Sequence, residues 1–284
     1  MADSYLPRLG RLTERFQFAM ADNVAMQTPV EAGDVSRIRI PGAVTTASLI
    51  ATVVLLALWA DEVVTIATRQ GELAFRIDGD RQLYANAALS WVRGDGFYLP
   101  HQLAGPYEIT PGDVLYPPPM LLIFAPFAMV QSLLYYLVPL AITAGVVFWH
   151  RPRIDAWPAI AFCLWWPTTT VVIAGGNPGI WLMAFMAMAT VSRAASPLIF
   201  LKPTLAPFAF FGVNRRSWWG GLAALVAVSI LFLPLWPDYI TATTNARGGG
   251  GIFYSISQAP MLLLPLVSWA RRTRRGDPSA IGTA

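Results

Sequence analysis

The sequence predicts an all-α protein that crosses a membrane several times. Of its 284 residues, 55% are hydrophobic and only 13% are charged, whereas a soluble domain has about 25% charged residues. Apolar runs recur at close to the length of about 18 residues that is needed to cross a hydrocarbon core. Basic residues flank these runs, and Lys202 is the one cation within such a segment. We therefore expect a single polytopic helical membrane domain.

About six apolar runs are candidate spans. They are Ala43–Ala60, Gln131–Trp149, Ala156–Ala174, Pro178–Val191, Trp218–Leu235 and Ala259–Ala270. The fourth and sixth are short, so we expect them to be matched by local thinning of the bilayer or extended by their neighbours. Two further stretches, Pro117–Val130 and Ser196–Val213, are interrupted by proline. Each is a full span, a half-helix or a re-entrant segment, because broken backbone is tolerated at membrane depth only where protein or water satisfies it.

The basic residues predict the orientation. Cytoplasmic loops of membrane proteins are enriched in Lys and Arg. With both termini inside, fourteen of the twenty basic residues face the cytoplasm and five lie outside. This orientation places the long loop 61–116 outside the cell and makes the chain a multi-pass protein of the plasma membrane, which we expect to be bacterial.

The chain ends are expected in the cytoplasm, on either side of the membrane domain 43–270. Residues 1–42 contain a basic amphipathic pattern formed by Leu6, Leu9, Leu12 and Phe16. This pattern is typical of a helix lying on the membrane surface, although a solvated tail is an equal alternative. Residues 271–284 form a basic tail. The positive charge suits anionic membrane lipids, and no soluble basic domain is present to bind nucleic acid.

The outer loop contains the first candidate chemistry, at "DGDRQLYANAALSWVRGDGFYLP", which begins at Asp78. Helical spacing of Leu83, Ala87 and Trp91 predicts a helix that starts just after Asp80. On this interpretation Asp80 lies near the N-cap, where its side-chain oxygens can accept from free backbone amides. Alternatively, a carboxylate at the membrane face acts as a general base, and nearby arginines hold a phosphate. Spacing alone leaves both alternatives open.

A series of short motifs resembles one family of membrane enzymes. In chain order they are "DRQLY" (Asp80–Tyr84), "AALSWVRGDGFY" with Gly94 and Tyr98, "LYPPP" with Tyr116, "GGN" ending at Asn177, "LKP" with Lys202, "NRRSW" (Asn214–Trp218) and "LWPDY" (Leu235–Tyr239). Together they resemble the GT-C-type glycosyltransferases, and most closely the mannosyltransferase-like glycosyltransferase family 87. The likeness extends from about Arg76 to Tyr239.

The resemblance implies an inverting sugar transfer on the extracytoplasmic face. The donor would be a sugar, with mannose the first candidate, on polyprenyl phosphate, and the acceptor a hydroxyl of a glycan, lipid or protein. Asp80 is the implied catalytic base, with Asp78 second. The implied substrate-binding residues are Arg81, Arg76, Tyr84, Tyr116, Asn177 and Lys202.

Three interpretations remain open beside that one. Lys202 could instead extend its ammonium to a lipid head group, and Asn177 could be a turn residue. The whole chain could also be a non-catalytic protein that binds or transports a lipid-linked substrate. We predict no cofactor and no metal, because His, Cys and carboxylates show no ligand-like spacing.

Overall fold

The computed structural model of the chain describes residues 42–69, 77–110, 112–248 and 256–273. The predicted amphipathic segment before residue 42, the candidate Arg76 and the basic tail beyond residue 273 lie outside these ranges. The described part is helical, apart from one short parallel pair of strands, β1 (Tyr107–Glu108) and β2 (Ala246–Arg247).

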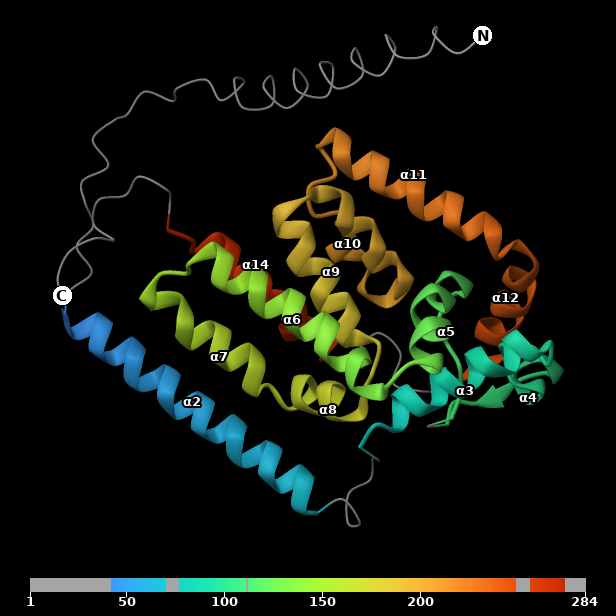
Figure 1. The fold of residues 1–284 in the computed structure, drawn as a ribbon, viewed down its shortest axis with the longest axis horizontal. Helices are drawn as coiled ribbons and strands as arrows, with labels where there is room; N and C mark the ends of the chain where they lie inside the picture. Colours follow the sequence, from blue (N-terminus) through green and yellow to red (C-terminus); the bar gives the residue numbers. More distant parts are fainter. Residues whose placement is uncertain (1–41, 70–76, 111, 249–255, 274–284) are drawn as a thin grey trace, which may run out of the picture. The chain divides into compact units, whose positions relative to one another are not determined.

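Several helices run between two ends of one unit (Figure 1). They are α2 (Gly42–Thr68), α6 (Ser132–His150), α7 (Trp157–Trp165), α8 (Pro167–Gly175), α9 (Gly179–Val191), α11 (Arg216–Leu231) and α14 (Ala259–Ala270). Among the described helices, α2 and α6 are each long and apolar enough to cross a membrane, and the number rises to four if two bent pairs each count as one span. These helices suggest a membrane protein. By length and composition they give two to four spans, fewer than the six that the sequence predicts.

Two of the predicted spans are bent in the structure. α7 meets α8 at 58°, and α11 meets the segment formed by η5 (Leu233–Leu235) and α12 (Trp236–Asn245) at 75°. Pro167 and Pro234 lie at the start of the second segment in each pair. Because proline has no N–H to donate to the preceding turn, it begins a helix readily but interrupts one that is already running.

The first predicted span was too short. α2 continues past Ala60 to Thr68, so Asp61 and Glu62 belong to the helix and not to the outer loop. Val63, Val64 and Ile66 keep the helix apolar there, and the Glu62 carboxylate accepts a hydrogen bond from Thr170 of α8 at 3.3 Å.

One end of the unit is rich in arginine, and we call it the arginine end. Asp155 lies 3.5 Å from both Arg153 and Arg271. The Arg193 guanidinium lies over the ring of Trp269, 5.0 Å from its centre. α2 begins at this end, beside η2 (Ile154–Ala156). Arg153, Arg193 and Arg271, which the sequence assigned to one side of the membrane, therefore lie at one end.

The opposite end, which we call the loop end, is formed by α3 (Gly79–Arg93), α4 (Pro100–Ala104) and α12 (Figure 1). The Tyr107 hydroxyl donates to the carbonyl of Ala242 at 3.1 Å, and the Asn245 side chain donates to the carbonyl of Gln102 at 3.0 Å. These bonds and the β1–β2 pair join two segments that are far apart in the sequence.

Both proline-broken segments return to the end from which they enter. α5 (Leu121–Met129), preceded by η1 (Pro118–Met120), packs against α3 and leads back into α6 at the loop end. The second segment enters from the arginine end as η3 (Arg193–Leu201), turns through η4 (Pro203–Leu205) and returns in α10 (Ala206–Ala209).

Contacts between its two arms establish that second reversal. The Ser196 hydroxyl donates to the Phe211 carbonyl at 2.6 Å, and the Arg193 guanidinium lies 4.1 Å from the centre of the Phe211 ring. We call residues 193–213 the Lys202 hairpin, because Lys202 lies at its tip. The sequence left open a full span, a half-helix or a re-entrant segment, and a reversal of this kind is the geometry that the last alternative requires.

Candidate functional site

Asp80 lies in the first turn of α3 and not at its cap. The helix begins at Gly79, and the N-cap position belongs to Asp78, whose backbone is left-handed with φ 62°. Asp80 therefore lies near the N-cap, as the spacing predicted, but its described hydrogen bond is not to a backbone amide of the helix. Its Oδ2 instead accepts a hydrogen bond at 2.6 Å from the side-chain amide of Asn177, which lies between α8 and α9. The predicted helix itself is confirmed, with Tyr84, Ala87 and Ala88 buried along one face.

Asp78 is occupied by partners that hold α3 in place. Its two oxygens accept from Nε and Nη2 of Arg81 at 2.5 Å each, and Oδ1 also accepts from the Tyr136 hydroxyl of α6 at 2.8 Å. Burial alone would raise the pKa of Asp78, but the hydrogen bonds from Arg81, Tyr136 and Gln82 outweigh it and hold that pKa below its ordinary value. Of the two candidate carboxylates, Asp80 has fewer hydrogen bonds among the described residues.

The turn that presents Asn177 depends on glycine. Gly176 has φ +69°, and a Cβ there would lie 2.5 Å from the Tyr136 hydroxyl and 2.8 Å from the Arg81 Cβ. Asn177 follows, and both the oxygen and the nitrogen of its side-chain amide form hydrogen bonds. Its Oδ1 accepts from the backbone N–H of Gly179 at 2.9 Å, and its amide nitrogen donates to Asp80. Asn177 is thus both the turn residue and the partner of Asp80.

Tyr116 links this turn to the aromatic core. Its hydroxyl donates to Asn177 Oδ1 at 3.3 Å, and its carbonyl accepts from the Tyr98 hydroxyl at 2.8 Å. The ring of Tyr84 meets the Tyr116 ring edge-on at 5.1 Å and stacks on Phe124 at 4.8 Å. Tyr84 is 7% exposed, so it supports the Tyr116 ring from within the core.

The side chain of Lys202 extends from the tip of the Lys202 hairpin to the ring of Tyr116. It is 9% exposed, and its Nζ lies 5.5 Å from the centre of the Tyr116 ring. The Nζ donates at 2.5 Å to Oε1 of Gln258, which directly precedes α14. The negative charge of Asp80 acts on the Lys202 ammonium group. Asp80 and Lys202 therefore lie close enough to influence each other electrostatically.

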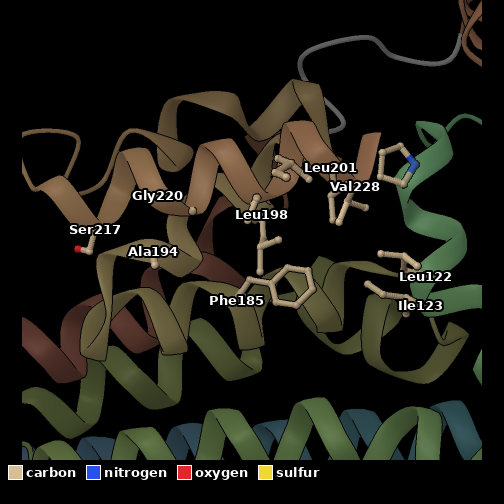
Figure 2. Close-up of a pocket in the computed structure, with 13 residues that line it drawn as sticks. Leu122, Ile123, Phe185, Ala194, Leu198, Leu201, Ser217, Gly220 and Val228 are labelled. Carbon is tan, nitrogen blue, oxygen red and sulfur yellow. The ribbon is translucent and has the colours of Figure 1, made fainter. Parts of the chain in front are cut away.

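An apolar cavity lies against the η3 arm of the Lys202 hairpin. Its volume is about 520 Å³, and α11, η3 and α5 form most of its wall. Leu198, Leu201, Phe185 and Val228 point into it, with Leu122 and Ile123 at one end (Figure 2). Leu201, which precedes Lys202 in the chain, lines the cavity, and Lys202 itself does not.

Comparison of the chain with protein-family models, with curated proteins and with solved structures found no match. The resemblance to the polyprenyl-phosphate-dependent glycosyltransferases therefore stays a prediction that rests on the motifs of the sequence.

The structure brings together most of the residues nominated from the sequence. Asp80, Asn177, Tyr116 and Lys202 form one series of contacts, and Asp78 with Arg81 lies beside it. Gln258 was missed, and its only signal was a polar residue just before the last apolar run. Within the described ranges, no three His, Cys, Asp or Glu side chains lie close enough together to hold a metal ion.

Both histidines have partners that the sequence did not reveal. His101 Nε2 lies 2.7 Å from Asp113 Oδ1 at the loop end, and His150 Nε2 lies 2.7 Å from the Thr190 hydroxyl near the arginine end. Each pair is formed between residues that are well separated in the sequence, and neither touches the Asp80 site through an observed hydrogen bond.

Proposed function

We propose that this chain transfers a sugar from polyprenyl phosphate to an acceptor hydroxyl, with Asp80 as the general base and Lys202 at the donor phosphate. One observation supports this proposal most strongly. Residues nominated from four separate motifs meet in one place, through the Asp80–Asn177 bond of 2.6 Å, the Asn177–Tyr116 bond of 3.3 Å and the 5.5 Å approach of Lys202 to the Tyr116 ring.

The proposed reaction is a single displacement. The acceptor oxygen attacks the anomeric carbon while the bond from that carbon to the phosphate oxygen breaks, so the configuration inverts. Asp80 takes the acceptor proton, and polyprenyl phosphate leaves with the bonding electron pair. Lys202 stabilises the negative charge on the departing phosphate, which is the kind of contact that lowers a barrier when charge develops in the transition state.

The geometry fits these roles. Asn177 binds Oδ2 of Asp80 and orients the carboxylate, and no described residue forms a hydrogen bond to Oδ1, which can therefore take the acceptor proton. Asp80 is partly exposed, so an acceptor can approach from the loop end. The cavity beside Leu201 suits the hydrocarbon part of a lipid-linked donor. On the predicted orientation, the loop end faces the cell exterior.

The donor class is tested with membranes that contain the full chain. We expect labelled sugar to move from polyprenyl phosphate into the lipid, glycan or protein fraction, and no transfer from a nucleotide sugar in the same membranes. Binding of polyprenyl phosphate without any transfer would favour the alternative of a lipid-binding or transport protein. Membranes from cells without the chain are the control.

A further inference from the structure

Among the described residues, the Gln258 side chain uses its amide oxygen but not its amide nitrogen in hydrogen bonds. Its side chain is completely buried, and Oε1 accepts from Lys202 Nζ. Its Nε2 has no hydrogen-bond partner among the described residues. A buried amide donor without a partner is costly, and here it lies next to the cation to which we assign the donor phosphate.

The chemistry of the Gln258–Lys202 contact favours an anion. An amide oxygen carries no formal charge, so this hydrogen bond orients the ammonium group without cancelling its charge. A carboxylate in the same position would neutralise it. The Tyr116 ring beside Lys202 is also uncharged at neutral pH, and Asp80 of α3 is the carboxylate whose charge acts on Lys202.

We propose that Gln258 completes a phosphate site around Lys202, with Oε1 orienting the ammonium group and Nε2 donating to a phosphate oxygen of a lipid monophosphate. This inference rests on the proposed function, because that function places the donor phosphate at Lys202. It adds a second donor from a residue outside the motifs on which the resemblance depends.

The pH dependence of phosphate binding separates this role from a purely structural one. Lys202 binds an anion while it is protonated, so binding is present at low pH and is lost as the pH rises and the ammonium group loses its proton. The hydrogen bond to Gln258 favours the protonated form. Removing that bond therefore lowers the pH at which binding is lost, whereas a carboxylate at the same position raises it.

The experiment measures binding of farnesyl phosphate to the purified full chain in detergent, between pH 6.5 and 9.5, with farnesol as the uncharged control. Gln258→Met removes the acceptor and the donor, and Gln258→Glu keeps an acceptor but cancels the charge. At pH 7 we expect both variants to bind farnesyl phosphate at least tenfold more weakly. The midpoint pH of binding should fall by about one unit in Gln258→Met and rise in Gln258→Glu. Gln131→Met, which replaces an exposed glutamine, should match the wild type.

Each outcome decides the inference. It is overturned if Gln258→Met keeps the wild-type affinity and midpoint, or if the wild type binds farnesyl phosphate no better than farnesol. If Gln258→Met does not fold, Gln258→Glu decides alone, and a midpoint that does not rise overturns the inference. A chain that binds farnesyl phosphate through Gln258 but transfers no sugar would leave the inference standing and contradict the proposed function. Sugar transfer at the wild-type rate in the Gln258 variants would contradict the inference and leave the proposed function standing.

Discussion

The side-chain amide of Asn177 donates a hydrogen bond of 2.6 Å to Asp80, across 97 positions of sequence. The same side chain accepts from Tyr116 and from the backbone of Gly179. Asn177 therefore fixes the orientation of Asp80 relative to both the α9 terminus and the aromatic core. If Asp80 is the base, its rate of proton transfer depends on this bond.

Replacement of Asn177 tests that dependence. Asn177→Ala frees the Asp80 carboxylate, and we expect the transfer rate to fall by a factor of about 10 to 100, as is typical when a positioned acid–base group is disturbed. Asn177→Asp places a like charge beside Asp80, which raises the pKa of a carboxyl group. The acidic limb of the pH–rate profile should then move to higher pH. A variant with an unchanged rate and profile would contradict the positioning role.

We expect the hydrogen bonds of Asp78 to stabilise the folded chain. It binds Arg81 and Tyr136, and hydrogen bonds to charged groups contribute about 1.5–3 kcal/mol each when well buried. Because Asp78 is partly exposed, we expect Asp78→Asn to lower the free energy of unfolding by only about 1–2 kcal/mol. Thermal unfolding of the purified protein measures this change. Arg93→Gln, an exposed site at the other end of α3, should have little effect.

The same carboxylate gives a pH dependence of definite sign. The pKa of Asp78 is below its ordinary value of 3.8 in the folded chain, so its stabilising contribution is fully present above pH 3.8. The contribution is lost as the pH falls through the lower, folded-state pKa. The stability of the wild type should therefore decline more steeply below about pH 4 than that of Asp78→Asn. Parallel curves would show that Asp78 is not the responsible group.

Gly176 should not tolerate a side chain. Its positive φ acts together with the lack of space, because a Cβ at this position would lie only 2.5 Å from the Tyr136 hydroxyl. Each such strained position costs about 1–3 kcal/mol. We expect Gly176→Ala to lower the unfolding temperature and to displace the Asp78–Tyr136 contact. Gly112→Ala is the matched control, because a Cβ at Gly112 meets no atom within 4 Å.

Orientation in the membrane is tested by cysteine labelling in a Cys163→Ala background. Cys163 is buried, and Asp95 and Asn214 are exposed at opposite ends of the unit. We expect a membrane-impermeant thiol reagent to label Asp95→Cys in intact cells, and to label Asn214→Cys only after permeabilisation. The reverse pattern would place the loop end in the cytoplasm and remove Asp80 from the outer face.

The sequence predicted the helices better than it predicted their ends and bends. Apolar runs located α6, α9 and α14 to within a residue or two, because uninterrupted hydrophobic length is itself the signal. The extension of α2 was missed because Asp61 and Glu62 look like loop residues until the partner Thr170 is known. The bends at Pro167 and Pro234 had a visible signal in the prolines themselves.

The candidate site was predictable as a set of residues but not as a geometry. The motifs nominated Asp80, Asn177, Tyr116 and Lys202, yet spacing did not distinguish a cap from a base at Asp80. Tyr136, which binds Asp78, and Gln258, which binds Lys202, lie far away in the sequence. Only the tertiary fold therefore shows that Asp78 has several hydrogen-bond partners and that Asp80 has fewer. Gln258 belongs to no motif and becomes visible only through its contact with Lys202.

The central claim is that Asp80 is the base for sugar transfer, and one measurement tests it most directly. The initial rate of transfer from labelled polyprenyl-phosphate sugar is compared among the wild type, Asp80→Asn and Asp95→Asn, at equal amounts of folded protein. Asp95 is an exposed carboxylate just beyond the end of α3. We expect Asp80→Asn to lose at least a factor of about 100, within the range for removal of a general base, while Asp95→Asn keeps the wild-type rate. Full activity in Asp80→Asn would contradict the assignment of the base.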